Sequence, residues 1–395
     1  MKFGLENISH VCAELGHPER TFRPVIIAGT NGKGSVAAMV HRGLRAAGHP
    51  AGRYTSPHLE RLEERFVMGD REVTAAELDS AARAVRAAAD ALLDAGRLAA
   101  PPTFFEATTA IAFEIFRRAD VSIAVLEVGL GGRLDATNVA EPVAAAITSI
   151  DFDHQAQLGR TLGAIALEKA GVIRRSIPVV CGEMAPIAEQ VIREVCGRVQ
   201  ARWRPAAACV SLEAITEGQP LALRGAHQRG NALVAACLLQ ELDAMGIPVG
   251  TAAIRSALLD VHWPGRLELI RYQGAEVLLD AAHNPAGARA LGAYLQELGW
   301  HDAVLVYGVA EDKDAAAMLA ALAPLCRDIV CTTPLTSRAA APAAVADLAR
   351  AAGVWRVTVE PDPRVALARA AALNPRIVIA GSIFLIGPLR GILRG

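Results

Sequence analysis

One glycine-rich stretch limits what this chain can fold into. Val25-Ile-Ile-Ala-Gly-Thr-Asn-Gly-Lys-Gly-Ser35 joins four apolar residues to a turn that contains Gly29, Gly32 and Gly34, and a helical apolar pattern follows from Val36 to Leu44. This order predicts a buried strand, a phosphate-binding loop and a helix. Glycines can adopt positive φ and close the backbone around an anion, toward which the helix directs its free N–H groups. The chain is therefore predicted to bind a phosphate group in an α/β fold.

The side chains of this stretch suit a nucleotide. Lys33 is expected to interact with the β- and γ-phosphates, and Ser35 with a phosphate-bound Mg²⁺. The match to G-x-x-x-x-G-K-[ST] is incomplete, because Ile27 replaces the first glycine and Gly34 separates Lys33 from Ser35. We interpret the stretch as a shorter variant. The alternative is a glycine-rich turn with a surface lysine, and the flanking strand and helix favour the phosphate loop.

Length and charge exclude several functional classes. A chain of 395 residues is too long for one compact core, so two or three domains are expected. The net charge of −1, without a long basic run, argues against a nucleic-acid partner held by phosphate contacts. No apolar run reaches the roughly 18 residues of a membrane span, and the N-terminal residues begin no targeting peptide, so we expect a soluble, cytoplasmic protein. The seven scattered cysteines indicate reduced thiols rather than disulfides or a zinc site.

Two polar residues stand at the ends of predicted buried strands. Glu127 lies near the end of the apolar run Val121 to Val128, and a buried carboxylate must be paired, hydrogen-bonded or bound to a metal. His154 follows the strand predicted for Val143 to Ile150. Both strand ends should neighbour the phosphate loop, so the two residues are candidate ligands of a divalent ion. A structural histidine is the alternative for His154.

Three further segments carry candidate binding residues. Thr55, Ser56 and His58 occupy a loop after a strand, which is either a polar site or a plain strand end. Phe104 and Phe105 begin a helix, where they either line a pocket for a flat heterocycle or belong to the core. A second glycine-rich loop, residues 129–138, carries Arg133 and Asp135, which we expect to orient a ligand.

Two helices add polar candidates. The helix predicted for Leu162 to Ala170 contains Lys169, which by itself resembles a solvated residue, and Gly171 is expected to end it as a glycine C-cap. A second helix begins at His227-Gln-Arg-Gly-Asn231, whose polar side chains either contact a nucleobase or cap the helix. Between these helices the region from a strand at residues 178–182 to about residue 222 is expected to be less regular.

A domain boundary is predicted near Trp263-Pro-Gly-Arg266, which gives domains of residues 1–266 and 267–395. Five strands alternate with helices beyond it, a pattern that predicts a smaller Rossmann-like domain. These strands are expected at residues 277–281, 303–309, 328–333, 354–359 and 376–381. Asp280, His283 and Asn284 are predicted to be exposed on the turn after the first of them, as binding residues or as an Asx turn.

Taken together, these motifs resemble the folylpolyglutamate synthase and dihydrofolate synthase branch of the Mur ligase superfamily, over nearly the whole chain. The motifs that carry the resemblance are Gly29-Thr-Asn-Gly-Lys-Gly-Ser35, Thr55-Ser-Pro-His-Leu59, Leu126-Glu-Val-Gly-Leu-Gly-Gly-Arg-Leu-Asp-Ala-Thr-Asn138, Asp153-His154, Glu168-Lys-Ala-Gly171, His227-Gln228 with Asn231, Pro264-Gly-Arg266, and Asp280 with His283-Asn-Pro285. The resemblance implies an α/β fold with a P-loop-containing, Mur-ligase-like central domain and a C-terminal glutamate ligase domain.

The resemblance also implies a reaction: an ATP-dependent ligase adds L-glutamate to a pterin carboxylate through an acyl phosphate. The implied cofactors are ATP and Mg²⁺, with two ions expected and a monovalent cation as a further candidate, and the protein is expected to be a monomer. Members usually carry a further helix before Phe3, so part of the pterin pocket is expected to differ here. A cell-wall Mur ligase acting on a UDP-muramoyl peptide and a non-catalytic ATP-binding module are the alternatives.

Site residues carry over by matching position. Catalytic roles are implied for Lys33, His154, Lys169 as a carbamylated lysine, Arg266 and His283. ATP contacts are implied for Gly29, Thr30, Asn31, Gly32, Lys33, Gly34, Ser35, Asn231, Arg266, Asp280 and His283. The implied pterin-binding residues are Phe3, Thr103, Phe104, Phe105, Leu134, Asp135 and Ala136, and the implied Mg²⁺ ligands are Ser56, Glu127 and His154.

Overall fold

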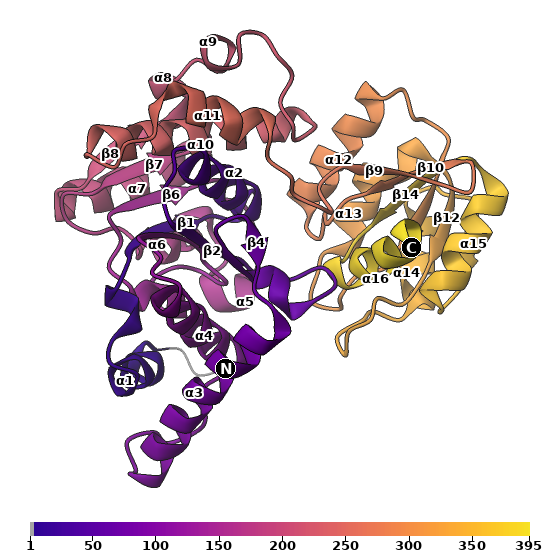
Figure 1. Cartoon of the computed structure of the whole chain (residues 1–395). Helices are drawn as coiled ribbons and strands as arrows, with labels where there is room; N and C mark the ends of the chain where they lie inside the picture. Colours follow the sequence, from indigo (N-terminus) through magenta and orange to yellow (C-terminus); the bar gives the residue numbers. More distant parts are fainter. Residues whose placement is uncertain (1–3) are drawn as a thin grey trace. The chain divides into compact units, whose positions relative to one another are not determined.

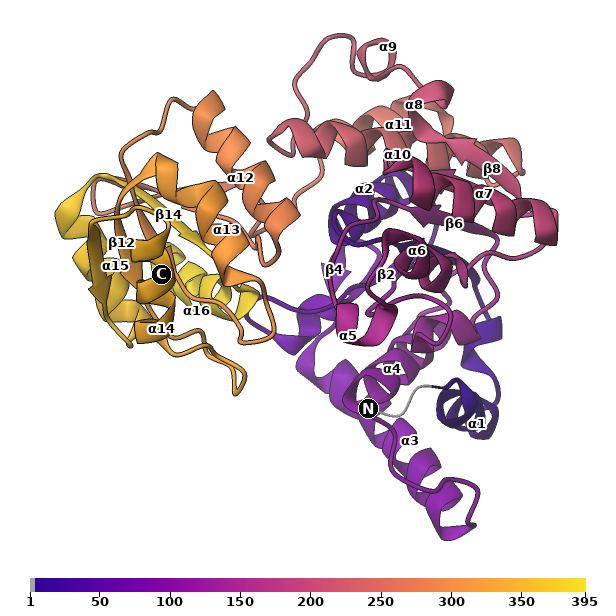
Figure 2. The same ribbon diagram turned by 180° about the vertical axis from the view of Figure 1, so that it is seen from behind.

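A computed structural model describes residues 4–395, and the chain divides into two compact units (Figures 1 and 2). Residues 4–222 and 228–262 form the first unit, and residues 223–227 and 263–395 form the second. Each unit contains one β-sheet with its own helices, which confirms the predicted α/β class. None of the helices between residues 4 and 395 combines the length and apolarity that a bilayer crossing requires.

The first unit contains an eight-stranded sheet in the order β4-β3-β2-β5-β1-β6-β7-β8. Its strands are β1 (Arg23–Ala28), β2 (Ala51–Tyr54), β3 (Phe66–Met68), β4 (Arg71–Glu72), β5 (Ile123–Glu127), β6 (Ala144–Ile147), β7 (Pro178–Cys181) and β8 (Arg202–Pro205). The six strands from β2 to β8 in this order are parallel, and β3 and β4 are antiparallel additions. β1 and β5 are buried on both faces, as their continuous apolar runs predict.

Helices cover both faces of this sheet, with α2 and α10 on one face and α4 and α6 on the other (Figure 1). The helices of the unit are α1 (Glu6–Glu14), α2 (Lys33–Ala46), α3 (Ala75–Asp94), α4 (Phe104–Arg118), α5 (Gln155–Leu158), α6 (Leu162–Ala170), α7 (Pro186–Val199), α8 (Ala206–Cys209), α9 (Leu212–Thr216), α10 (Ala226–Ala244) and α11 (Gly250–Leu259), with 3₁₀ turns η1 (Pro18–Arg20), η2 (Leu62–Arg65) and η3 (Ala136–Val139). Because β1, β5 and β6 are parallel neighbours, their carboxyl ends bring the phosphate loop, Glu127 and the segment after Ile147 to one edge of the sheet.

The second unit contains a six-stranded sheet in the order β13-β12-β11-β14-β10-β9. Its strands are β9 (Glu268–Tyr272), β10 (Ala275–Leu279), β11 (Ala303–Tyr307), β12 (Cys326–Cys331), β13 (Arg356–Val359) and β14 (Arg376–Ala380). Its helices are α12 (Pro285–Glu297), α13 (Ala315–Leu322), α14 (Pro342–Ala351), α15 (Pro363–Leu373) and α16 (Ile383–Arg394), with the turn η4 (Ala323–Leu325). The five predicted strands are present. β9 was not predicted, because it is a half-buried antiparallel edge strand in which Glu268 and Arg271 leave no continuous apolar run.

Two local predictions are wrong. The region after β7 is regular, since the amphipathic helix α7 buries Ala188, Ile192 and Cys196 against the core and β8 follows it. Gly171 does not end α6 in the left-handed conformation of a glycine cap, because its φ is −62°. All seven cysteines are free thiols, and all but the half-buried Cys209 are buried.

Candidate functional site

The phosphate loop, residues 29–35, connects β1 to α2 and depends on two of its glycines. Gly29 and Gly32 have φ values of 141° and 86°, which side-chain-bearing residues rarely adopt. A β-carbon on Gly29 would lie 2.0 Å from Thr148 Oγ1, and one on Gly32 would lie 2.2 Å from Asn231 Oδ1. Gly34 is different, because it lies within α2 and does not have the positive φ that we expected. The loop therefore needs glycine at two positions for both conformation and space.

Hydroxyl groups at the end of β6 hold the phosphate loop. Thr148 Oγ1 and Ser149 Oγ donate to the carbonyl oxygen of Asn31 at 2.6 and 3.1 Å. Asn31 N donates to Ser149 Oγ at 3.1 Å, and Thr30 Oγ1 accepts from Asp151 N at the same distance. Thr148 and Ser149 were not predicted as site residues, although they directly follow the end of β6. These hydrogen bonds fix the phosphate loop to the segment that follows the neighbouring strand β6.

Helix α10 supports the loop from a distant part of the sequence. Gln228 Nε2 donates to Ser35 Oγ at 3.2 Å, and Asn231 Nδ2 donates to Gln228 Oε1 at 2.8 Å. All three side chains are buried, and Asn231 also lies against Gly32. Of the two roles considered for these residues, nucleobase contact and helix capping, neither describes these bonds, which join α10 to the phosphate loop.

Two lysine amines meet at one carbonyl oxygen of the loop. Lys33 Nζ donates to Gly29 O at 3.1 Å and to Thr30 O at 3.0 Å, and Lys169 Nζ donates to Gly29 O at 2.8 Å. Lys169 is only 5% exposed, so it is not the solvated helix residue that its sequence context suggests. Burial lowers the pKa of Lys169 from 10.5 to about 7, and the positive charge of Lys33 contributes in the same direction. An amine with this pKa is largely neutral at mildly alkaline pH.

The predicted metal ligands include a buried carboxylate. Glu127 is the last residue of β5, and its Oε2 accepts a hydrogen bond from Ser56 N at 3.1 Å. His154 directly precedes α5 as its N-cap, in the left-handed conformation, and its backbone N–H donates to Asp153 Oδ1 at 2.9 Å. Among residues 4–395 no three His, Cys, Asp or Glu side chains form a group that could hold a metal ion. The donors present suit Mg²⁺, which takes one or two carboxylates together with phosphate oxygens and water.

The two aromatic rings at the start of α4 have different environments. Phe104 is 60% exposed, and the guanidinium of Arg65 lies 5.3 Å from its ring centroid. Phe105 instead packs against the Tyr54 ring at 6.1 Å, and a β-carbon on Gly129 would lie 2.5 Å from it. Phe104 therefore has a ring surface that a ligand can contact, whereas Phe105 belongs to the packing below the loop.

Other predicted substrate-binding residues have structural partners. Thr103 caps α4 by accepting from Glu106 N at 3.3 Å. Asp135 is buried and organises its own loop: it accepts from Gly129 N, Leu130 N, Thr137 N and Thr137 Oγ1 at 2.6 to 3.0 Å. Ala136 is buried and Leu134 half-buried in the same loop, and Phe3 lies outside the described residues. Arg133 is exposed and pairs with Glu168 at 2.9 Å.

In the second unit, Asp280 and Asn284 are buried, so the prediction that they are exposed is wrong. Asp280 accepts from Leu267 N and Ala282 N, both at 2.9 Å, and Asn284 Oδ1 accepts from Gly287 N as the cap of α12. Burial raises the pKa of Asp280, against the opposing charges of Arg266 and His227. His283 Nδ1 donates to Ala281 O at 2.8 Å. This turn thus combines an Asx cap with a buried carboxylate near Arg266.

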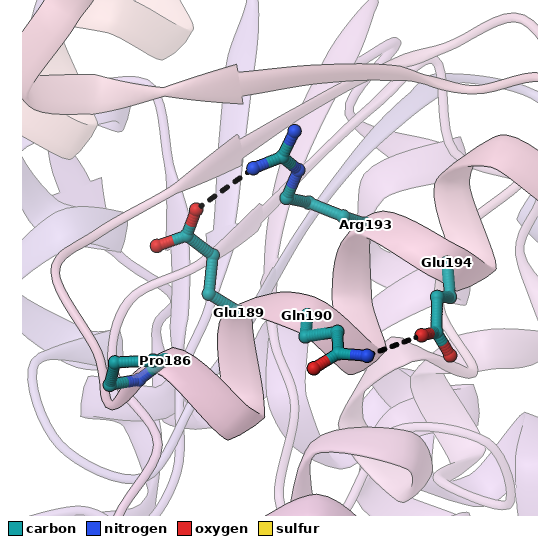
Figure 3. Close-up of a pocket in the computed structure, with 5 residues that line it drawn as sticks. All are labelled: Pro186, Glu189, Gln190, Arg193 and Glu194. Carbon is teal, nitrogen blue, oxygen red and sulfur yellow. Dashed lines mark hydrogen bonds and ion pairs between the residues drawn. The ribbon is translucent and has the colours of Figure 1, made fainter.

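A surface hollow on α7 contains none of the predicted site residues. Figure 3 shows its lining, which is Pro186, Glu189, Gln190, Arg193 and Glu194. Two of its polar pairs are one helical turn apart: Arg193 with Glu189 at 3.6 Å and Gln190 with Glu194 at 2.9 Å. Because these groups bond along the helix, they do not converge on a ligand.

Comparisons with known proteins identify the family. Residues 265–383 match the model of the Mur ligase glutamate ligase domain. A folylpolyglutamate synthase from Lacticaseibacillus casei is 32% identical over 406 residues, which cover 96% of this chain and 92% of that protein. This chain belongs to the folylpolyglutamate synthase and dihydrofolate synthase family. Its predicted resemblance to the Mur ligase superfamily is thereby confirmed.

Further family members show how much of the chain is shared. A probable bifunctional folylpolyglutamate synthase/dihydropteroate synthase from Haloferax volcanii is 33% identical over 99% of this chain, which spans only 48% of that protein. The solved structure of Mycobacterium tuberculosis folylpolyglutamate synthase complexed with ADP has a TM-score of 0.91 and 33% identity, with 98% and 94% of the two chains covered. A bifunctional family member with Mn, AMPPNP and L-glutamate bound has a TM-score of 0.85 and 29% identity, with 100% and 95% covered.

Proposed function

We propose that this chain is an ATP-dependent ligase that adds L-glutamate to the carboxylate of dihydropteroate, of folylpolyglutamate or of both. The products are ADP and phosphate, and the reaction proceeds through an acyl phosphate. The observation that carries the proposal is the phosphate loop with the Lys33 and Lys169 amines on Gly29 O, in a chain of this ligase family. The ligands of the related structures, ADP, and Mn with AMPPNP and L-glutamate, support the same reaction.

The residues of the chain account for the first step. A carboxylate is a poor electrophile, so a phosphoryl group must be transferred to it before an amine can attack. The N–H groups at the start of α2 and the Lys33 amine bind and neutralise the phosphates, because the transferring group carries negative charge. Arg266 is a further proposed ATP contact. Bound Mg²⁺ would supply further charge neutralisation, and Glu127, Ser56 and His154 are the residues that would hold it.

Lys169 is proposed to be carbamylated. The pKa of about 7 leaves its amine largely neutral at mildly alkaline pH, and only a neutral amine adds CO₂. The neutral amine adds CO₂ and releases one proton to solvent, which gives a carbamate anion that attracts Lys33, whereas the ammonium form would repel it. In this role Lys169 supports the metal site. His283, in the second domain, is proposed as a further catalytic residue.

The acceptor is proposed to bind at Phe104, whose exposed ring can stack on a flat heterocycle. Leu134, Asp135 and Ala136 form the neighbouring loop, in which Asp135 fixes the backbone rather than offering a free carboxylate. We further propose that residues 1–266 bind the nucleotide phosphates and that residues 267–395 form the glutamate ligase domain. Two Mg²⁺ ions are proposed to take part, with a monovalent cation as a further candidate. The enzyme is proposed to act as a cytoplasmic monomer without nucleic-acid partners.

One set of assays tests the proposal. Purified protein is incubated with ATP, Mg²⁺ and L-glutamate, and with dihydropteroate, tetrahydrofolate or a UDP-muramoyl peptide as separate acceptors. Glutamylated pterin products and glutamate-dependent ADP release are expected. A product from the muramoyl peptide alone would identify a cell-wall ligase instead. ADP release that is independent of glutamate and of every acceptor would contradict the proposed ligase.

A further inference from the structure

The end of α6 and the loop of residues 129–138 pack backbone against backbone. A β-carbon on Gly171 would lie 2.3 Å from Arg133 Cβ and 2.4 Å from Arg133 Cα. A β-carbon on Gly132 would lie 2.8 Å from Lys169 O and 3.0 Å from Glu168 O. Gly171 has an ordinary helical φ of −62°, so any residue could adopt its conformation. Glycine is therefore required there for space alone.

Hydrogen bonds also join the end of α6 to the loop of residues 129–138. Arg133 N donates to Glu168 O at 2.9 Å, and Asn138 Nδ2 donates to both Arg133 O at 3.1 Å and Gly171 O at 3.0 Å. The exposed ion pair between Arg133 and Glu168 adds little, because solvent screens it. The backbone contact and the buried Asn138 amide hold the two segments together.

This contact fixes the position of the Lys169 backbone. Lys169 lies in the last turn of α6, two residues before Gly171, and its Nζ reaches Gly29 O at 2.8 Å. A lysine side chain has many rotamers, so its amine meets one buried carbonyl oxygen only if its Cα is held in place. We propose that Gly132, Gly171 and Asn138 are positioning residues, which hold the Lys169 amine against the phosphate loop.

The inference rests on the proposed function, in which Lys169 serves the ligation. It extends that function to residues that touch neither nucleotide nor acceptor in the proposed mechanism. It also links the loop of residues 129–138, proposed to bind the acceptor, to the phosphate loop through α6. Since carbon atoms in ordinary contact lie roughly 3.5 Å apart, a separation of 2.3 Å requires a displacement of about 1 Å, which is enough to take the Lys169 amine from 2.8 Å out of hydrogen-bonding range of Gly29 O.

Two variants and one control test the inference. Gly171→Ala introduces the clash with Arg133. Asn138→Ala adds no atom and removes three hydrogen bonds: the two that Asn138 donates to the contact and one that it accepts from Arg174. Gly163→Ala is the control in the same helix, because its β-carbon would meet only Val191 and Ile187 side chains at 3.8 and 3.9 Å. The first measurement is the rate at which acetic anhydride acetylates Lys169 in the protein without ATP, followed by peptide mass spectrometry. The second is the kcat and the KM for ATP of the ligase reaction.

We expect faster acetylation of Lys169 in Gly171→Ala and Asn138→Ala, and wild-type acetylation in Gly163→Ala. The kcat of both variants should fall roughly tenfold or more while the KM for ATP changes little, because misplaced catalytic groups slow the chemical step. Wild-type acetylation of Lys169 in both variants would overturn the inference, even if activity fell. If Gly171→Ala does not fold, Asn138→Ala alone decides. If the wild type ligates none of the acceptors, the proposed function fails, and the acetylation rates still decide the positioning.

Discussion

Replacement of Lys169 by methionine tests whether the buried position near Gly29 destabilises the charged form of the Lys169 amine relative to water. Methionine keeps most of the length of the side chain and removes the charge. The folded pKa of about 7 lies below the ordinary value of 10.5, so between these pH values the unfolded chain binds more protons than the folded one. The stability of the wild type should therefore rise with pH in that range, and the stability of Lys169→Met should not share this rise.

The magnitude follows from the same two pKa values. Their difference, at about 1.4 kcal/mol for each pH unit, makes the charged amine cost roughly 5 kcal/mol below pH 7. The lost hydrogen bond to Gly29 O offsets about 1 kcal/mol of this at every pH. Lys169→Met should thus be the more stable protein at pH 6, and its advantage should shrink by roughly 2 kcal/mol by pH 8.5.

Hydrogen exchange of the buried strands β1 and β5 measures this difference for the first unit by itself. Wild type and variant are compared at the same pH in CO₂-free buffer, so the intrinsic exchange rates cancel. Bicarbonate added at pH 8.5 should slow exchange in the wild type only, because the neutral amine of the folded protein adds CO₂ whereas the protonated amine of the unfolded chain does not. A difference between the two proteins that is constant from pH 6 to 8.5 would refute the reasoning, since it would mean that the Lys169 amine titrates as it does in the unfolded chain.

Four other variants test separate parts of the site. Glu127→Gln should raise the Mg²⁺ concentration needed for activity and lower turnover by orders of magnitude with the fold intact, and an unchanged Mg²⁺ titration would argue against a metal ligand. Phe104→Ala should cost roughly 1–3 kcal/mol of pterin binding and leave ATP affinity unchanged. Equal losses of pterin and ATP binding in this variant would indicate core damage. Phe105→Ala should instead lower thermal stability. Thr148→Val removes the hydroxyl group that donates to Asn31 O, and it should raise the KM for ATP. A wild-type KM would show that the phosphate loop keeps its shape without this hydrogen bond.

The parts of the fold that follow from local patterns were predictable. The apolar runs of β1, β5 and β6 identify buried parallel strands, and the helix predicted for Leu162 to Ala170 has the observed bounds. The helix α7 was missed although its pattern is local. Ala188, Ile192 and Cys196 are buried, and Val191, Val195 and Val199 pack beside them, so apolar residues recur at helical spacing along the whole element.

The contacts around the phosphate loop were not predictable in the same way. The loop itself is local, since a strand, three glycines and a helix follow one another in the sequence. Its supports are not local: Thr148 lies 117 residues from Asn31, and Gln228 lies 193 residues from Ser35. Neither side chain differs in its sequence context from an ordinary strand end or helix start. Only the pairing of β1 with β6 brings Thr148 to the loop.

Buried carboxylates show why residue type alone does not identify a ligand-binding group. A carboxylate that binds a metal and one that organises a turn both need nearby hydrogen-bond donors, so both occur in polar, glycine-rich segments. Asp135 and Asp280 accept backbone N–H groups from two to thirteen residues away along the chain, which stabilises their own loops. Glu127 accepts from Ser56, 71 residues away at the end of a neighbouring strand. A carboxylate that joins two strand ends beside a phosphate loop is placed where parallel sheets bind ligands, and this position, rather than its burial, makes Glu127 the strongest metal ligand candidate.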